Sequence, residues 1–399
     1  MVGVILLMFE SVLHRTVRTA KEHTIFMRLR VGHSAAILKS PNLGKRHRMT
    51  RPYCTESIAN QLAALGLPFP AIFARALVAL LTARKISVQH IASLMPGEQN
   101  LEANRQQLRR CLDHETLTAP SWTRTLAALL PRTAWILSLD RTEWKRGDTI
   151  VNLLVLAVVI HGCAVPLLWT VMPNCGASNT ATRKELLGRF LNLFGRQRVR
   201  FLTADREFIG QDWIGWLIEK KIPFRIRIKA NEYLSHADGR EERACDWFAL
   251  RACRCKPKAM RLWGLSVFVG GKRLRDDQYL IIISNEFSDD LWEDYRARWK
   301  IETLFQALKG RGFDLEDCRL SRERRLSGWF GFLALGLCWC LKVGQCMEEA
   351  NPLPPKKHGR RAISVFQRGL RELQSLLAPL AGNLSPQRFS TVLTMLRSV

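Results

Sequence analysis

The alternation of hydrophobic and polar residues changes character near residue 134. Between residues 55 and 130, apolar residues recur at spacings of three and four, which is the periodicity of one helix face. Short breaks containing Pro or Gly separate these segments, so this part predicts a small all-helical domain. The segments 134–144, 148–162 and 165–173 are instead short, rich in Val, Ile and Leu, and closely connected, which predicts three successive strands.

Helices and strands alternate after the third predicted strand. We expect an amphipathic helix at 181–195, a strand at 199–208, a helix at 210–221 and a strand at 223–230. The resulting order, β-β-β-α-β-α-β, matches the ribonuclease-H-like fold, in which three antiparallel strands precede alternating helices and parallel strands. The predicted fold class is therefore α/β, with a ribonuclease-H-like core flanked by N-terminal and C-terminal helical regions.

The last helix of this fold does not follow at once. Residues 231–287 intervene, and their pattern predicts a β-rich insertion with a hairpin turn at Gly270-Gly271. The missing helix is then expected at 288–309. Further helical segments are expected near 324–347, 361–378 and 385–397.

These patterns divide the chain into six parts. Residues 1–48 form a basic leader without a sustained pattern, and because it ends in a basic cluster just before Met49, we hypothesise that translation starts at Met49. The other parts are a helical region at 49–130 that could bind DNA, the first part of the core at 131–230, the insertion at 231–287, the last core helix and the end of the core at 288–347, and C-terminal helices at 348–399.

The charge of the chain is strongly unbalanced. It has 61 Lys and Arg against 35 Asp and Glu, a formal net charge of +26 over 399 residues. Such an excess favours polyanionic partners through electrostatic steering and counterion release. The hydrophobic content of 47% also allows a sizeable core. A basic soluble protein without a nucleic-acid role remains the alternative.

Cysteine usage and hydropathy favour a cytoplasmic protein without a membrane partner. Eleven cysteines are present and no CxxC pair occurs, so we expect reduced thiols rather than a disulfide framework or a zinc site. The apolar segment 326–344 is the main membrane candidate. Three glycines and Ser327 interrupt it, and its uninterrupted part falls short of the ~20 residues that cross a bilayer, so we expect a buried core helix.

Two aspartates mark the ends of predicted strands. Asp140 is expected to end the first strand and Asp205 the fourth, and in a ribonuclease-H-like sheet these strands are neighbours. With Glu302 from the last helix they would form an oxygen-only site, which suits Mg²⁺ or Mn²⁺. Two such ions about 4 Å apart can activate water and stabilise the leaving oxygen of a phosphodiester. Taken singly, Asp140 could be a turn residue, and Asp205 could simply pair with Arg206.

The last predicted helix separates into two faces. At about 100° per residue, Tyr295, Arg298, Glu302 and Lys309 fall within about 60° of one another. Apolar residues occupy another face, namely Ile301, Leu304, Phe305 and Leu308. A surface helix with an ordinary Arg298–Glu302 salt bridge would explain part of this pattern.

The spacing Tyr295-x2-Arg298-x3-Glu302-x6-Lys309 resembles the Y-R-E-K signature of bacterial cut-and-paste transposases of the insertion-sequence-four group. Asp205-Arg206-Glu207-Phe208 is similar to the second-Asp motif of that group, and Asp140 fits its first-Asp strand. Glu302 lies 97 positions after Asp205. This gap is similar to the family's β-strand insertion before the catalytic helix.

This resemblance implies a DDE transposase that binds the terminal inverted repeats of its own insertion sequence as a dimer. Asp140, Asp205 and Glu302 would be the catalytic residues and would hold two Mg²⁺ or Mn²⁺ ions. Endonuclease cleavage would free a 3′-hydroxyl, which would then attack target DNA. The resemblance places DNA contacts at Tyr295, Arg298, Lys309 and Arg206.

Three other functions stay open at this point. A ribonuclease-H-like DNA nuclease would cut without strand transfer, an inactive derivative would only bind DNA, and a basic scaffold protein would show no preference for terminal repeats. The sequence leaves undetermined the inverted repeat, the target preference, a hairpin intermediate and the helical region that reads the ends.

Overall fold

The structure is a computed structural model that describes most of residues 51–377. The predicted leader at 1–48, the proposed start at Met49 and the predicted helix at 385–397 lie outside the described residues. Within 51–377, the structure does not describe 84–86, 147–148, 161, 174, 250–255, 275–277, 311, 319, 321, 355 and 357–360.

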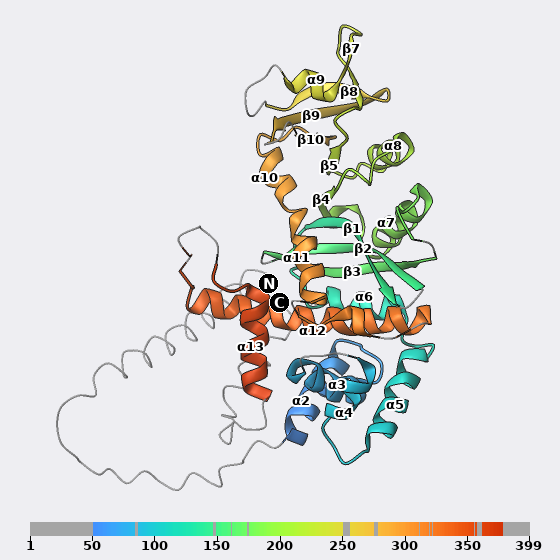
Figure 1. The fold of residues 1–399 in the computed structure, drawn as a ribbon, viewed down its shortest axis with the longest axis vertical. Helices are drawn as coiled ribbons and strands as arrows, with labels where there is room; N and C mark the ends of the chain where they lie inside the picture. Colours follow the sequence, from blue (N-terminus) through green and yellow to red (C-terminus); the bar gives the residue numbers. More distant parts are fainter. Residues whose placement is uncertain are drawn as a thin grey trace, which may run out of the picture. The chain divides into compact units, whose positions relative to one another are not determined.

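A single mixed sheet organises the described chain (Figure 1). Its ten described strands lie in the order β3-β2-β1-β4-β5-β10-β9-β8-β6-β7. Their bounds are β1 Trp135–Arg146, β2 Thr149–Ile160, β3 Cys163–Met172, β4 Val199–Ala204, β5 Phe224–Ile228, β6 Tyr233–Ser235, β7 Glu241–Arg243, β8 Lys258–Leu262, β9 Leu265–Arg273 and β10 Tyr279–Ser284.

The first five strands have ribonuclease-H-like topology. β1, β2 and β3 form an antiparallel meander, whereas β4 pairs in parallel with β1 and β5 pairs in parallel with β4. The predicted α/β fold class and its ribonuclease-H-like core are therefore confirmed.

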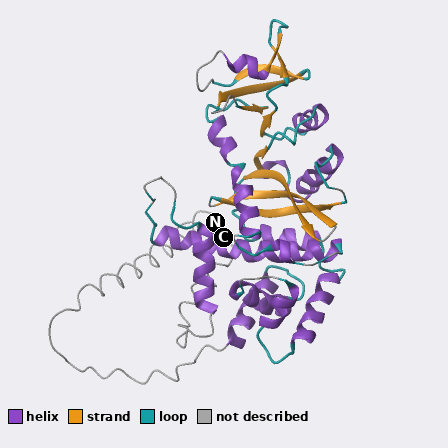
Figure 2. Ribbon diagram, in the orientation of Figure 1, coloured by secondary structure: helices purple, strands orange, loops and turns teal. Residues whose placement is uncertain are grey.

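Figure 2 shows the helices in the same orientation as Figure 1. They are α2 Arg51–Ala64, α3 Pro70–Thr82, α4 Val88–Leu94, α5 Leu101–Asp113, α6 Ala119–Ala127, α7 Thr180–Phe194, α8 Gln211–Glu219, α9 Ala244–Ala249, α10 Leu291–Arg296, α11 Trp299–Leu308, α12 Glu323–Ala350 and α13 Val365–Leu377.

The two faces of β1 meet different helices because successive strand residues point to opposite sides. Trp135 packs its ring edge-on against Phe190 and Phe194 of α7. Trp144 and Asp140 point to the other face, where Trp144 lies under the Lys309 ammonium at the end of α11. The site residues of β1 and of α11 therefore share the face of the sheet away from α7.

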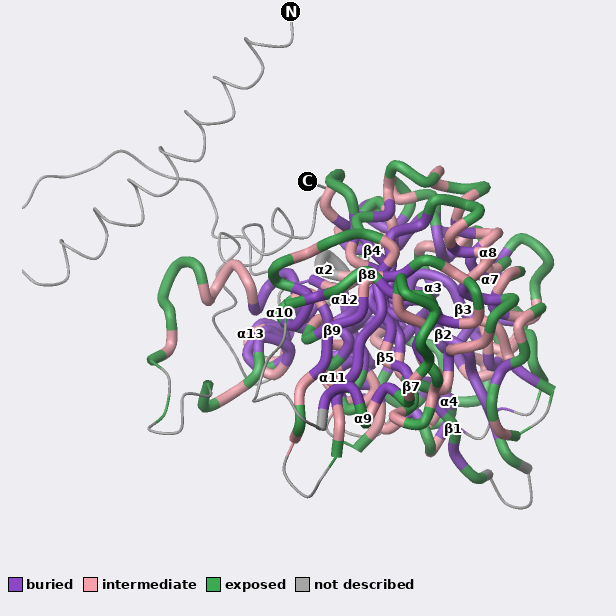
Figure 3. Tube along the Cα trace, turned by 90° about the horizontal axis from the view of Figure 1, so that it is seen from above, coloured by how far each residue is buried: buried purple, intermediate pink, exposed green. Residues whose placement is uncertain are grey.

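Helix α12 is the central helix of the molecule. It is long and apolar enough to cross a membrane, but 94% of its most apolar window is buried inside the protein. It packs against β3, α6 and α13, and the indole Nε1 of Trp169 on β3 donates a 2.8 Å hydrogen bond to Ser327 Oγ. At Gly331 a Cβ would lie 2.5 Å from the Trp122 ring, so this glycine permits the close approach of α6. The prediction of a buried core helix is confirmed, and Figure 3 shows its buried course.

The insertion extends the core sheet instead of forming a sheet of its own, because β10 pairs antiparallel with β5. The predicted hairpin turn at Gly270-Gly271 is wrong: both glycines lie inside β9 and pair with β10. The turn lies at Trp263 and Gly264, whose φ angles are 51° and 81°. Gly271 is needed for packing, since a Cβ there would lie 2.2 Å from the Phe248 ring.

Candidate active site

Asp140 and Asp205 are neighbours where the parallel pairing of β1 and β4 ends. Leu139 and Ala204 form the last pair of that ladder; Asp140 is the next residue of β1, and Asp205 is the first residue after β4. Neighbouring strands lie about 4.8 Å apart, so the two aspartates follow the last pair side by side, and the charge of Asp205 acts on Asp140. The prediction that β1 ends at Asp140 is wrong: β1 continues to Arg146 because β2 pairs with it along that length.

A buried arginine fixes the turn that carries Asp205. Arg183 of α7 donates from Nη2 to Glu207 O at 3.0 Å and from Nη1 to Ile209 O at 3.3 Å. Its guanidinium also lies 5.0 Å from the centre of the Phe208 ring. These contacts hold the turn after β4 against α7, and the backbone N–H of Arg206 then donates to Asp205 Oδ1 at 2.7 Å.

The segment facing the two aspartates is two helices and not the single helix predicted for 288–309. Helix α10 ends at Arg296 and α11 begins at Trp299. Between them, the Ala297 and Arg298 N–H groups bond to carbonyls three residues back, which tightens the turn. Both residues keep right-handed helical φ and ψ, so the polar stripe continues across the break.

A buried ion pair attaches α10 to the sheet. Arg225 on β5 donates from Nε to Asp294 Oδ2 at 3.0 Å and from Nη1 to Ser284 Oγ at 2.8 Å. Ser288 Oγ donates to the same carboxylate at 3.0 Å. Because Asp294 directly precedes Tyr295, this network sets the position of the polar stripe over the strand ends.

Arg298 links the first aspartate to the glutamate of the predicted triad. Its Nη1 lies 3.8 Å from Asp140 Oδ2, and its Nη2 donates to Glu302 Oε1. The arginine is 7% exposed, whereas 46% of the Glu302 side chain is exposed. The Arg298–Glu302 salt bridge considered from sequence is present, but it lies at the strand ends beside Asp140.

Burial and mutual repulsion perturb the ionisation of the site. Burial raises the pKa of Asp140 to about 6, and the charges of Glu207 and Asp205 add to this effect, while Arg298 opposes it. Burial also raises the pKa of Tyr295 above its usual value, and the charge of Asp205 raises it further. Within the described structure the Tyr295 hydroxyl has no hydrogen-bond partner. The site therefore combines excess negative charge with an unused buried hydroxyl.

The other predicted DNA-contacting residues lie around this centre. Lys309 Nζ donates to Glu143 O at 2.9 Å and pairs with Glu316 Oε1 at 2.9 Å. Arg206 is exposed beside Asp205. The structure thus gathers Asp140, Asp205, Tyr295, Arg298 and Glu302, and it leaves Lys309 and Arg206 at the rim.

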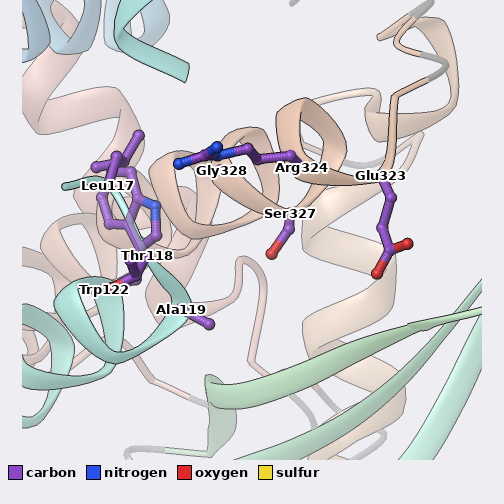
Figure 4. A pocket seen from close by; sticks show the side chains of 8 residues that line it. All are labelled: Leu117, Thr118, Ala119, Trp122, Glu323, Arg324, Ser327 and Gly328. Carbon is purple, nitrogen blue, oxygen red and sulfur yellow. The ribbon is translucent and has the colours of Figure 1, made fainter. Parts of the chain in front are cut away.

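Two pockets give context to the site. The first adjoins the polar stripe and is lined by Lys272, Leu280, Trp292, Glu293, Tyr295, Arg296 and Trp299. The second lies between the starts of α6 and α12 and contains none of the predicted site residues (Figure 4). Tyr295 is the one predicted site residue that lines the first pocket, so this pocket adjoins the acidic site without containing its carboxylates.

The donor set fits a hard divalent cation in chemistry but is not assembled for one. Asp140, Asp205 and Glu302 offer only carboxylate oxygens, which Mg²⁺ and Mn²⁺ prefer. Among the described residues, however, no three Asp, Glu, His or Cys side chains converge closely enough to hold a metal ion. Arg298 lies between two of these carboxylates, since it binds Glu302 and faces Asp140.

Comparison with known families identifies the domain that contains this site. A family model described as "Transposase DDE domain" matches residues 131–339, more than half of the chain. The chain belongs to the DDE transposase family. The matched range of the transposase contains Asp140, Asp205 and Glu302, together with the whole insertion between the last two.

Two further comparisons complete this result. The transposase is similar to a solved chain described as "Cryo-EM structure of piggyBac transposase synaptic complex with hairpin DNA (SNHP)", with 11% identity and a TM-score of 0.40. The similarity covers 86% of this chain and 82% of that chain. A search of curated proteins found no match.

Sequence reasoning missed the buried residues that position the transposase site. Arg183 looks like an ordinary polar position on an amphipathic helix, so its pattern gives no signal. Arg225 does give one, because a charged residue inside the apolar strand 223–230 requires a partner. That partner, Asp294, is 69 positions away and could not be identified from spacing.

Proposed function

We propose that this transposase cleaves DNA at the terminal inverted repeats of its own insertion sequence and joins the freed 3′ ends to target DNA. The observation that carries the proposal is that Asp140 and Asp205 follow the last pair of the β1–β4 ladder, with Arg298 facing Asp140 and binding Glu302. The Y-R-E-K spacing further supports membership of the insertion-sequence-four group. We also propose that the protein works in the cytoplasm as a homodimer.

In this proposal the three carboxylates hold two Mg²⁺ or Mn²⁺ ions. When bound, these ions supply an activated nucleophile and stabilise charge at the scissile phosphate. Arg298 and Tyr295 bind and orient the DNA phosphate beside the carboxylates, the arginine through a bidentate fork. Lys309 and Arg206 extend the positive rim along the DNA backbone, consistent with the net charge of +26.

The helical region at 49–130 is our candidate for reading the DNA ends. Arg75 of α3 donates to Pro96 O at 2.7 Å and to Asn104 Oδ1 at 2.6 Å, and Asn104 donates to Ala92 O at 3.1 Å. This network fixes the turn between α4 and α5, in the manner of a helix-turn-helix unit. The outer face of α5 carries Arg and Gln side chains, which suit base edges in the major groove: Arg105, Gln106, Arg109 and Arg110.

A two-ended assay tests the proposed reaction. The purified protein is incubated with Mg²⁺, a target plasmid and a DNA fragment. This fragment carries the terminal repeats that flank the gene of the protein. We expect the wild type to cleave and to join, and Glu302→Gln to do neither. Glu293→Gln is the matched control, because Glu293 is an exposed glutamate that pairs with Arg296 outside the site.

The same assay separates the alternatives. Cleavage without joining would favour a DNA nuclease, and binding without chemistry in the wild type would favour an inactive derivative. Activity that survives Glu302→Gln would remove the basis for assigning Glu302. Replacing Arg109 and Arg110 by Ala should weaken binding to end DNA more than to unrelated DNA if α5 reads the ends.

A further inference from the structure

We propose that Arg298 is a latch that keeps the metal site closed until DNA is bound, so that metal ions and DNA bind cooperatively. The inference rests on the proposed function, because it concerns when the carboxylates become available to metal. Its basis is the position of the Arg298 guanidinium, which binds Glu302 and faces Asp140.

The guanidinium lies between two of the carboxylates that would hold the metal ions. Mg²⁺ requires ligand oxygens at about 2.0–2.1 Å, and the positively charged guanidinium competes with it for the same two carboxylates. Arg298 binds Oε1 of Glu302 and lies 3.8 Å from Oδ2 of Asp140. Moving this side chain is therefore a condition for bringing the three carboxylates together.

The arginine is held tightly by charge but incompletely by hydrogen bonds. Burial lowers its pKa, yet the neighbouring Tyr295, Glu302 and Asp205 raise the pKa above the usual value, so the guanidinium stays charged. Within the described structure its Nε has no hydrogen-bond partner. A buried unsatisfied donor is costly, and a phosphate can accept from two guanidinium N–H groups at once.

A DNA phosphate would therefore exchange partners with the carboxylates. The guanidinium lies over the ring of Trp299, 5.8 Å from its centroid, and this ring is exposed, so a phosphate that contacts Trp299 would lie within reach of Arg298. Glu302 is the mobile partner, because nearly half of its side chain is exposed and its helix position needs no change. Released from Arg298, it can rotate toward the strand aspartates and complete the donor set.

The latch predicts reciprocal coupling between metal and DNA, since two ligands that favour the same state raise each other's affinity equally. We would measure Mn²⁺ binding by electron paramagnetic resonance, without and with a duplex that carries a terminal repeat. For the wild type we expect binding at least about tenfold tighter with the duplex, within the usual range of coupling between sites.

Removing the latch should separate the two ligands. Arg298→Met keeps an unbranched side chain of similar bulk without charge, so we expect it to bind Mn²⁺ tightly without DNA and to gain little when DNA is added. Arg296→Met is the control, because Arg296 is exposed and pairs with Glu293. Adding Asp140→Asn to Arg298→Met should abolish the tight Mn²⁺ binding that Arg298→Met shows without DNA. This result would assign the Mn²⁺ site to the carboxylates.

Equal Mn²⁺ affinity of the wild type with and without DNA would overturn the proposal. The comparison of the wild type with and without DNA needs no variant, so it is decisive even if circular dichroism shows Arg298→Met to be unfolded. Tight Mn²⁺ binding by Arg298→Met that survives the addition of Asp140→Asn would also overturn the proposal. Cleavage is scored separately in the two-ended assay. If DNA does not change the Mn²⁺ affinity of the wild type but the wild type cleaves end DNA, the latch proposal is wrong and the proposed function is retained. If the wild type neither cleaves end DNA nor binds Mn²⁺, the proposed function is wrong as well.

Discussion

Arg225 on β5 and Asp294 on α10 form a largely buried ion pair with 3.0 Å between Nε and Oδ2. The pair joins the core sheet to α10, the helix that carries Tyr295, the first residue of the polar stripe. Asp294→Ala would leave the arginine buried with its charge unpaired, which costs about 3 kcal/mol in comparable pairs. We expect a loss of this size in the free energy of unfolding, measured by urea denaturation.

A variant that lacks both charges separates the effect of the unpaired arginine from the loss of side-chain packing. Arg225→Met combined with Asp294→Leu removes both charges, so the double variant should recover much of the stability lost in Asp294→Ala. A loss in Asp294→Ala well below 1 kcal/mol would show that α10 is held by its apolar contacts alone.

Arg183 should matter for chemistry as well as for stability. Arg183→Lys keeps a positive charge but replaces the two nitrogens that bond to Glu207 O and Ile209 O with a single ammonium on a shorter reach, so the turn that carries Asp205 should shift. Displacements of about 1 Å in a site can reduce rates up to a hundredfold, and we expect at least a tenfold slower cleavage. The measurement is single-turnover cleavage of end DNA under saturating enzyme.

Arg189→Lys provides the comparison for Arg183. Arg189 lies on the same helix and is also partly buried, but it donates to Thr170 Oγ1 and Trp169 O on β3. It should therefore change stability without a comparable change in cleavage. Equal effects of both substitutions on the rate would argue against a special role for the turn after β4.

Gly271→Ala should destabilise the insertion. The added Cβ would lie 2.2 Å from the Phe248 ring, and overpacking of this kind typically costs about 1–3 kcal/mol. Gly264→Ala meets no atom within 4 Å and carries only the strain of a positive φ, about 1 kcal/mol. In thermal denaturation, the melting temperature of Gly271→Ala should be lower than that of Gly264→Ala. Adding Phe248→Leu to Gly271→Ala should restore part of the lost melting temperature. The reverse ranking would contradict the packing of α9 on β9.

The thiols of α12 should be unreactive in the folded protein. Burial raises the pKa of Cys338 to about 12 and the pKa of Cys340 well above its usual value, so neither forms thiolate near neutral pH. Cys175 is exposed. Iodoacetamide labelling read out by peptide mass spectrometry should modify Cys175 in the native protein and the α12 thiols only after unfolding. Native labelling of Cys338 would contradict the central position of α12.

The core could be predicted because its strands and helices are marked by hydrophobic patterns within short segments of the sequence. The apolar strands, the alternating helices and the place of Asp140 and Asp205 follow from periodicity and topology, and the structure confirms their neighbourhood. The end of β1 could not be predicted, because it depends on pairing with β2. The position of the hairpin turn depends on a positive φ at Trp263, a residue type that gives no turn signal.

The contacts among the charged side chains of the site could not be predicted as well from the sequence. The helical stripe correctly placed Arg298 beside Glu302, but the stripe cannot show that the guanidinium also faces Asp140. Lys309 fits the same stripe, yet its ammonium binds Glu143 O and Glu316 at the rim. Such partners come from distant segments, so they depend on the folded structure and not on spacing.

The central claim is that Asp205 holds a catalytic metal ion, and a metal-specificity switch tests it most directly. Mg²⁺ strongly prefers oxygen ligands, whereas Mn²⁺ accepts sulfur more readily. We would measure end-DNA cleavage by Asp205→Cys in each metal, with circular dichroism to establish folding. The account predicts no cleavage in Mg²⁺ and restored cleavage in Mn²⁺. Cleavage by Asp205→Cys at the wild-type rate in Mg²⁺ would contradict it.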